Sequence, residues 1–149
     1  GFNYRMTDIQ AALGLSQLTK LDTFIHRRNE LADRYRALLA PLPVVLPPEA
    51  PKGFTHGYHL FAVRVRDRER VFNGLRSAGI GVQVHYVPIH HHPISIDIGI
   101  GPGDLPVCDE AYDQLISLPM FPELTEEEIG YVVDRVNAFF VQHPKSAKR

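Results

Sequence analysis

A helical pattern of apolar residues fills about the first quarter of the chain and constrains its fold more than any other feature. Thr7 and Gln10 have the spacing of a capping box, which begins many helices. A continuous helix from Thr7 to Leu39 would be about 50 Å long, which is too long for one small domain. The helix is therefore predicted to break near residues 19–22 or to span two domains. The apolar residues at close to helical spacing are Ile9, Leu13, Leu18, Leu21, Ile25, Leu31, Tyr35 and Leu38.

The rest of the chain alternates between short strands and helices. The segments His59–Val65 and Ile80–Tyr86 are rich in β-forming residues and predict two strands. Asp67 is placed to cap a helix between them, over about Arg68–Ala78, and Gly79 to close it. This order predicts a βαβ-like unit. The other predicted elements are a short strand at Val44–Leu46 within the proline-rich residues 41–51, a helix over about Pro106–Leu115, a short ISLP segment at Ile116–Pro119, and a helix from a second capping box at Thr125 and Glu128 to about Val141.

These elements predict the α/β fold class, as a small layer of a few strands with helices on one face. The long N-terminal helix leads into that layer. The loop Pro88–Gly103 is rich in proline, glycine and histidine, and loops of this length are often functional. We expect a helical linking segment over residues 1–40, a small α/β domain over residues 41–143 and a polar tail over residues 144–149.

Composition and charge exclude several classes of protein. Apolar residues make up 44% of the 149 residues, and the formal net charge is −1. Nucleic-acid-binding domains are usually more basic, so we expect no nucleic-acid partner. No apolar run approaches the roughly 20 residues of a membrane helix, so no membrane association is expected. A single cysteine, Cys108, allows no internal disulfide, which makes the cytoplasm the expected compartment.

Histidine is concentrated in one short stretch of the chain. His85, His90, His91 and His92 lie within eight residues, and imidazole is a common ligand for transition metals. Successive side chains of an extended segment point in alternate directions, so at most two of three consecutive histidines share a face. A closed zinc site uses four ligands, and Cys108 is isolated. We therefore expect no metal site, with His85 and His90 at the mouth of a pocket and His91 and His92 exposed.

A short polar and aromatic segment, GFNYRM, precedes the first predicted helix. Asn3 offers a donor and an acceptor, and Arg5 offers a planar fork suited to phosphate or carboxylate. Their place just before a helix N-terminus favours an anion. The alternative is that Asn3 makes a turn and Arg5 pairs with Asp8, and the residues alone do not separate the two readings.

Four segments of the chain resemble, in order, motifs of the DegT/DnrJ/StrS aminotransferases. They are GFNYRMTDIQAALGLSQL (Gly1–Leu18), YHLFAVRV (Tyr58–Val65), GIGVQVHYVPIH (Gly79–His90) and ISLPMFPELTEEE (Ile116–Glu128). These enzymes use pyridoxal 5′-phosphate, have fold type I, and aminate keto sugars on nucleotide carriers. The first segment and GVQVHYVPIH most resemble the branch that aminates a UDP-linked 4-keto-6-deoxy amino sugar for pseudaminic acid.

The resemblance implies a fold, a partner and roles for individual residues. The fold would be the C-terminal small domain of an aspartate-aminotransferase-like enzyme, with a mostly antiparallel sheet. The enzyme would be a homodimer with shared active sites that takes its amino group from glutamate. Asn3 would reach the cofactor phosphate of the partner subunit, and Arg5 would lie at the same site as a candidate for the glutamate carboxylate. The residues implied near the nucleotide sugar are His85, Tyr86 and His90, together with His59 of the HLF strand. The family commonly has Glu where this chain has Asp109.

The Schiff-base lysine of that family has no counterpart in this chain. The four lysines are Lys20, Lys52, Lys145 and Lys148, and none has the family's context. The first residue is Gly1 and the first methionine lies inside the helical pattern, so we expect a C-terminal part of a longer protein that is inactive alone. Two alternatives stay open, namely a non-catalytic module that binds sugar nucleotides and a related deoxysugar dehydratase.

Overall fold

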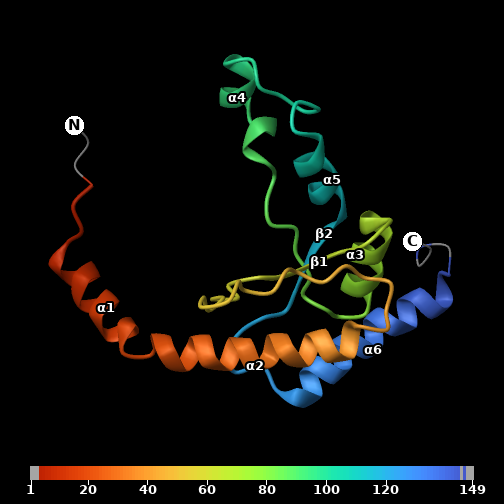
Figure 1. Ribbon diagram of the computed structural model, residues 1–149, viewed down its shortest axis with the longest axis horizontal. Helices are drawn as coiled ribbons and strands as arrows, with labels where there is room; N and C mark the ends of the chain where they lie inside the picture. Colours follow the sequence, from red (N-terminus) through yellow and green to blue (C-terminus); the bar gives the residue numbers. More distant parts are fainter. Residues whose placement is uncertain (1–3, 145, 147–149) are drawn as a thin grey trace.

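The computed structural model describes residues 4–144 and residue 146. Figure 1 shows α1 and α2 in succession along one side of the molecule, with α6 against the end of α2 and a separate projection that carries α4 and α5. Asn3, Lys145 and Lys148 lie outside the described residues. The elements are α1 (Asp8–Leu18), α2 (Leu21–Leu39), β1 (Phe61–Arg64), α3 (Arg68–Ser77), the 3-10 helix η1 (Ile89–His91), α4 (Pro93–Asp97), α5 (Pro106–Gln114), β2 (Leu115–Leu118) and α6 (Glu126–Gln142).

The long N-terminal helix is broken into α1 and α2, which confirms the predicted break near residues 19–22. Thr7 caps α1 through the predicted capping box with Gln10. The chain then turns at Thr19 and Lys20, where the Thr19 hydroxyl donates to the carbonyl of Ser16, and α2 begins at Leu21. No residue of α1 is buried, whereas the second half of α2 is packed into the core. No helix in the described part of the chain combines the length and apolar character needed to cross a bilayer.

The sheet is small and antiparallel. β1 pairs with β2, with Phe61 opposite Leu118 and Val63 opposite Ile116. Single bridges extend it on both sides, from Val45 to Arg64 and from Gln83 to Ser117. The strand predicted at residues 44–46 is therefore only the first of these bridges. The small antiparallel sheet with accompanying helices confirms the α/β fold class.

Two of the predicted strands are shorter than expected, and local hydrogen bonds explain why. Tyr58 has a positive φ of 39° and donates its backbone N–H to Nδ1 of His56, so the chain bends before β1 begins at Phe61. In the segment predicted as a strand over residues 80–86, the N–H of Val82 bonds to the carbonyl of Ile80. That local bond removes a donor from the ladder, and in this segment only Gln83 makes a bridge to β2.

The predicted βαβ-like unit has an inserted strand. β1 and the segment at Gln83 each run antiparallel to β2, so they are parallel to each other with β2 between them. The predicted ISLP segment at Ile116–Pro119 thus supplies the central strand. Helix α3 connects the two outer segments, and Gly79 closes it with a φ of 82°, as predicted.

Asp67, by contrast, does not cap α3 through its side chain. Its backbone adopts a left-handed conformation with a φ of 52°. Its carboxylate accepts a hydrogen bond from the hydroxyl of Ser146 instead, beyond the end of α6. Asp67 thus holds the N-cap position of α3 as expected, but its side chain makes no capping bond because it is turned toward Ser146.

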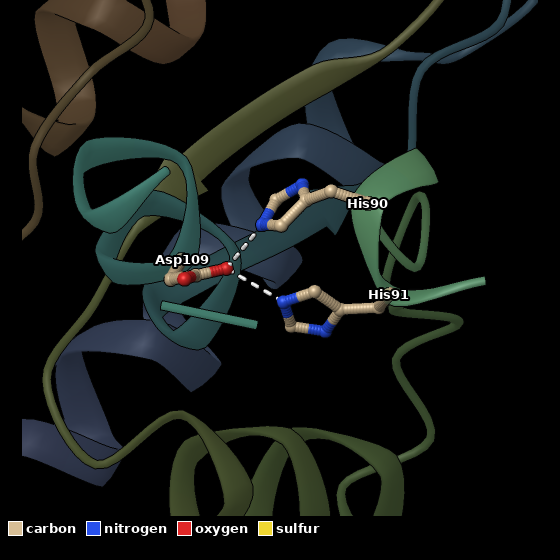
Figure 2. Close-up of side chains that lie close together, drawn as sticks. All are labelled: His90, His91 and Asp109. Atoms are coloured by element: carbon tan, nitrogen blue, oxygen red, sulfur yellow. Dashed lines mark hydrogen bonds and ion pairs between the residues drawn. The ribbon is translucent and has the colours of Figure 1, made fainter. Parts of the chain in front are cut away.

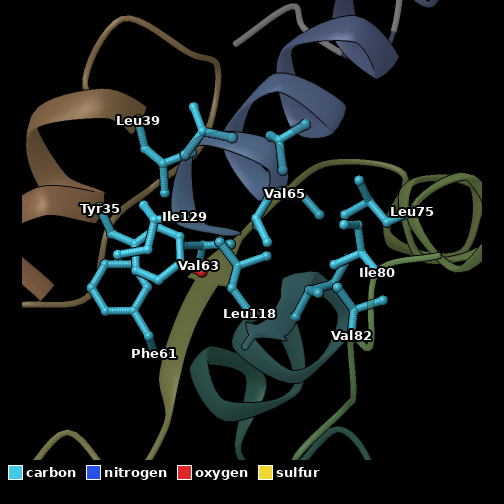
Figure 3. Packing of buried hydrophobic residues seen from close by; sticks show 14 of the residues in the cluster. Tyr35, Leu39, Phe61, Val63, Val65, Leu75, Ile80, Val82, Leu118 and Ile129 are labelled. Carbon is cyan, nitrogen blue, oxygen red and sulfur yellow. The ribbon is translucent and has the colours of Figure 1, made fainter. Parts of the chain in front are cut away.

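The core lies between one face of the sheet and helices α2, α3 and α6. Figure 3 shows Tyr35 of α2, Phe61 of β1 and Ile129 of α6 meeting there. Tyr35 and Phe61 stack with ring centroids 5.0 Å apart, and the Tyr35 hydroxyl donates to the carbonyl of Pro119 at 3.0 Å. Ala62 and Ser117 occupy the alternate positions of the two strands, so their side chains belong to the opposite face.

Residues 87–114, which we call the arm, project from the sheet (Figure 1). The arm holds η1, α4 and α5. The loop predicted at Pro88–Gly103 is thus partly helical. Its chain returns to the body at Gln114, whose carbonyl accepts the N–H of Val65 next to β1.

Candidate functional site

The predicted site residues lie in different parts of the structure. Arg5 is in the segment before α1, which Figure 1 shows apart from the arm. His59 is exposed in the bend before β1. His85, Tyr86 and His90 lie where the sheet passes into the arm. Asn3 is outside the described residues, so its predicted role stays a prediction.

His85 lies on the face of the sheet opposite to the core. Its Nδ1 lies 2.9 Å from the hydroxyl of Ser117, which is buried in the central strand. That bond fixes the ring orientation and leaves Nε2 for another partner. The neighbouring Tyr86 ring meets His85 edge-on at 4.7 Å and is 69% exposed. The two side chains therefore combine a fixed polar group with an accessible aromatic one, an arrangement that suits a polar ligand with a flat face.

His90 and His91 converge on Asp109, as Figure 2 shows. Both histidines come from η1, and Asp109 comes from the first turn of α5. Nε2 of each histidine lies 2.6 Å from the same oxygen, Oδ1 of Asp109. Because an ionised carboxylate only accepts hydrogen bonds, each ring donates its Nε2–H to that oxygen. We call these three residues the His–Asp cluster.

Asp109 is strongly held in its ionised form. Its second oxygen, Oδ2, accepts the backbone N–H of Gly103 at 2.8 Å. This backbone bond, followed by those from His90 and His91, lowers the pKa of Asp109 to about 2. The carboxylate thereby joins three points of the arm, and its charge persists at any pH where the protein is expected to work.

Two further hydrogen bonds shape the loop that the His–Asp cluster anchors. The hydroxyl of the buried Ser95 donates to the carbonyl of Ile89, and the N–H of Gly101 donates to Asp104. Together with Asp109 they fix the path of the chain from η1 to α5. The arm is thus a structured element whose shape depends on a few polar contacts.

Sequence reasoning missed two residues of this site and misplaced one. Ser117 lies in the ISLP segment and Asp109 stands where the family commonly has Glu, but neither was assigned a role, and only the fold brings them to His85 and His90. His91 was expected to be exposed, but its side chain is only 22% exposed because it packs beside Asp109 and Tyr112. The expectation failed because η1 is helical, so its consecutive histidines do not alternate as on an extended chain. His92, expected to be exposed, is exposed.

Much of the arm and of α1 is apolar and uncovered. On the arm the exposed large apolar residues include Ile89, Ile94, Ile96, Ile98, Ile100, Leu105 and Val107. On α1 and its flanks they include Met6, Ile9, Leu13, Leu15, Leu18 and Leu21. Exposed apolar surface of this extent is typical of interfaces.

Comparison with known proteins assigns this architecture to a family. Residues 1–137 match the model of the DegT/DnrJ/EryC1/StrS aminotransferase family. The chain is 32% identical over 132 residues to a UDP-N-acetyl-3-dehydro-alpha-D-glucosamine 3-aminotransferase of Acidithiobacillus ferrooxidans, covering 89% of this chain and 35% of that protein.

Solved structures agree with this match. DesV of S. venezuelae, in complex with a ketimine intermediate, superposes with a TM-score of 0.86 at 34% identity, covering 100% of this chain and 38% of that one. PseC of Helicobacter pylori, an aminotransferase of pseudaminic acid biosynthesis, superposes with a TM-score of 0.79 at 28% identity, covering 95% and 39%. The chain thus spans well under half the length of these relatives. It belongs to the DegT/DnrJ/EryC1/StrS aminotransferase family.

Proposed function

We propose that the protein containing this chain is a pyridoxal-phosphate-dependent aminotransferase acting on a nucleotide-linked sugar. The amino donor is glutamate, and the acceptor is a UDP-linked 4-keto-6-deoxy amino sugar of the pseudaminic-acid type. The observation that carries the proposal is the family match over residues 1–137, which includes the whole sheet and the arm. The pseudaminic-acid branch is supported by the GVQVHYVPIH segment and by the likeness to PseC.

Within this proposal, the base of the arm faces the nucleotide sugar. His85 offers its free ring nitrogen to a sugar or phosphate oxygen, since Ser117 already holds the other one. Tyr86 offers an exposed ring. His90 helps to shape the side of the sugar site but does not offer Nε2 to the sugar, because that nitrogen is bonded to Asp109. His59, exposed in the bend before β1, is proposed as a further contact to the nucleotide sugar.

Arg5 and Asn3 are proposed to act in a neighbouring subunit of a homodimer. They lie just before α1, whose apolar surface has no cover among the described residues. Docking of α1 onto a second subunit would bury that surface. It would also carry the two side chains to the partner's site, where Asn3 binds the cofactor phosphate and Arg5 the glutamate carboxylate. Residues 1–40 would then link the arm-bearing domain to the cofactor domain and the dimer interface.

The described lysines do not fit the cofactor. Lys20 lies in the turn between α1 and α2, and Lys52 in the proline-rich loop, and both are exposed. A Schiff-base lysine is desolvated or flanked by groups that lower its pKa, which neither position provides. We therefore propose that the lysine comes from another part of the whole protein and that the 149 residues alone are inactive. The cofactor, when bound, supplies the electron sink for amino transfer. The single cysteine keeps the cytoplasm as the proposed location.

The test is an amino-transfer assay on the whole gene product with glutamate, pyridoxal phosphate and the UDP-linked 4-keto-6-deoxy amino sugar. The expected result is 2-oxoglutarate and an aminated sugar nucleotide, identified by mass spectrometry. The matched control is the GDP-linked 4-keto-6-deoxy sugar, for which turnover should be much lower. A preference for the GDP sugar would contradict the substrate assignment, and loss of a sugar hydroxyl without amination would favour the dehydratase alternative.

The same assay on the 149-residue chain separates the remaining alternatives. Transamination by that chain would contradict the proposed origin of the lysine. If the whole gene product binds the UDP sugar but transfers no amino group, the non-catalytic binding module is the correct reading.

A further inference from the structure

The His–Asp cluster brings three metal-ligand atoms together. Nε2 of His90, Nε2 of His91 and a carboxylate oxygen of Asp109 all lie within 4.8 Å of one another. We propose that these residues form a binding site for a divalent transition-metal ion of the zinc type, which the proposed amino transfer does not require. The expectation of no metal site depended partly on the alternation of histidines on an extended chain, and that premise does not hold because Ile89–His91 form a 3-10 helix.

The donor set suits such an ion. Imidazole nitrogen and carboxylate oxygen bind Zn²⁺ at about 2.0–2.2 Å, and two ligands of a tetrahedral ion lie about 3.3 Å apart. The present N–O distances of 2.6 Å belong to hydrogen bonds. To bind a common ion, each imidazole nitrogen would therefore move away from Oδ1 of Asp109 by less than an ångström. Magnesium and calcium prefer sets made of oxygen ligands, which disfavours them here.

The exchange of hydrogen bonds for metal bonds balances without a further reactant. In the metal-free state each imidazole donates its Nε2 proton to Oδ1 of Asp109. On metal entry each ring carries its proton on Nδ1, and the Nε2 lone pair binds the ion. Oδ1 of Asp109 binds the same ion, and water completes the shell.

Burial and supporting bonds distinguish this site from a surface run of histidines. His90 is 5% exposed, while His91 and Asp109 are 22% and 21% exposed, so the site is partly desolvated and still open on one side. Gly103 orients the carboxylate through the other oxygen, the kind of supporting bond that tunes metal sites. His92, the third histidine of the run, is exposed and is absent from the cluster.

The decisive experiment measures metal binding by the whole gene product after removal of metals with a chelator. Titration calorimetry with Zn²⁺ and visible spectroscopy with Co²⁺ should show one saturable site per chain. His91→Ala and Asp109→Asn should each weaken Zn²⁺ binding by more than about tenfold. Loss of a group that only supports a ligand already lowers metal affinity by about that factor, and these two residues are ligands themselves. His92→Ala is the matched control and should leave the affinity unchanged.

A second measurement avoids variants that fold poorly. Diethyl pyrocarbonate modifies accessible imidazoles, and peptide mass spectrometry separates the sites. Zn²⁺ should protect His91 of the wild-type protein and leave His92 reactive. The proposal is overturned if the wild-type protein shows no saturable binding, if His92→Ala weakens binding as much as His91→Ala, or if Zn²⁺ fails to protect His91. None of these outcomes bears on amino transfer, so the two proposals are tested separately.

Discussion

At the scale of single residues, the structure depends on polar groups placed inside the core with a partner. Tyr35 is fully buried, and its hydroxyl donates to the carbonyl of Pro119, directly after β2. One side chain thereby ties α2 to the end of the central strand. Burial raises the pKa of Tyr35, because the ionised phenolate would lose its hydration.

Replacement of Tyr35 by Phe should lower the free energy of unfolding by about 1–2 kcal/mol. The ring still packs, but the carbonyl of Pro119 loses its hydrogen-bond donor in a partly buried position. Tyr131→Phe is the control, since Tyr131 also donates to a backbone carbonyl, that of Ala78, but is 48% exposed. Water can replace that bond, so its loss should cost less than about 0.5 kcal/mol. Urea denaturation measures both, and equal losses would contradict the assigned role of burial.

The residue scale is also where sequence reasoning was least complete. The positions of His85 and His90 in a polar site could be suggested from their motif, but Asp109 and Ser117 could not. Their side chains gain partners 18 to 32 residues away in the chain, and pairings of that kind leave no local pattern. The burial of His91 likewise follows from the single turn of η1 and not from the HHH run.

At the scale of elements, α3 and α6 are packed closely through a glycine. A Cβ atom added at Gly74 would lie 2.6 Å from Cδ2 of Phe139. The glycine thus lets the Phe139 ring approach the backbone of α3.

Gly74→Ala should therefore destabilise the protein by about 1–3 kcal/mol, the usual cost of overpacking. Gly130→Ala in α6 is the matched control, because a Cβ there meets nothing within 4 Å. It should raise stability by about 1 kcal/mol through helix propensity. Thermal or urea unfolding measures the stability of both variants. A stabilising Gly74→Ala would contradict this prediction, because it would show that α3 and α6 can move apart without loss of stability.

The capping box of α6 predicts a pH-dependent stability. The backbone N–H and then the hydroxyl of Thr125 lower the pKa of Glu128. A carboxyl with a lowered folded-state pKa stabilises the protein above its unfolded pKa, about 4.3, and loses that effect as the pH falls. Glu128→Gln should therefore lower the melting temperature at neutral pH, and the difference from wild type should shrink in acid.

Glu123→Gln, at an exposed position before the same helix, is the control for that experiment. Its melting temperature should follow the wild type at every pH. A Glu128→Gln difference that persists unchanged well below pH 4 would contradict the assigned pKa direction.

Helices were predictable from the sequence because their signals are local. Both capping boxes, the end of α3 at Gly79 and the break before Leu21 match the expectations. The strands were less predictable. The β-forming segment at residues 80–86 makes only one bridge, since its partner β2 also pairs with β1 and its own backbone bonds locally.

At the scale of the whole molecule, α1 stands apart from the core. It contains no buried residue, whereas α2 supplies Leu31, Ala32, Tyr35 and Leu39 to the core. The apolar residues of this continuous sequence pattern therefore belong to two different surfaces. Those of α1 are exposed, and those of the second half of α2 pack in the core.

Leu13→Asp in α1 should shift the whole gene product from dimer toward monomer, because it places a charge on the surface proposed to bind a second copy. Ala37→Asp, at an exposed position of α2, is the control and should leave the dimer intact. Light scattering coupled to size-exclusion chromatography gives the mass of each variant. An unchanged mass for Leu13→Asp would contradict the proposed interface.

The position of β2 between β1 and the segment at Gln83 has a consequence for synthesis on the ribosome. A nascent chain that has emerged as far as Gln114 holds both flanking segments but not the strand that joins them. Until Leu115–Leu118 appear, β1 lacks its main partner strand, although α2, whose Tyr35 stacks on Phe61, has already emerged. The order of translation therefore makes pairing of this sheet a late event, because the arm emerges before β2, the strand that joins the two flanking segments.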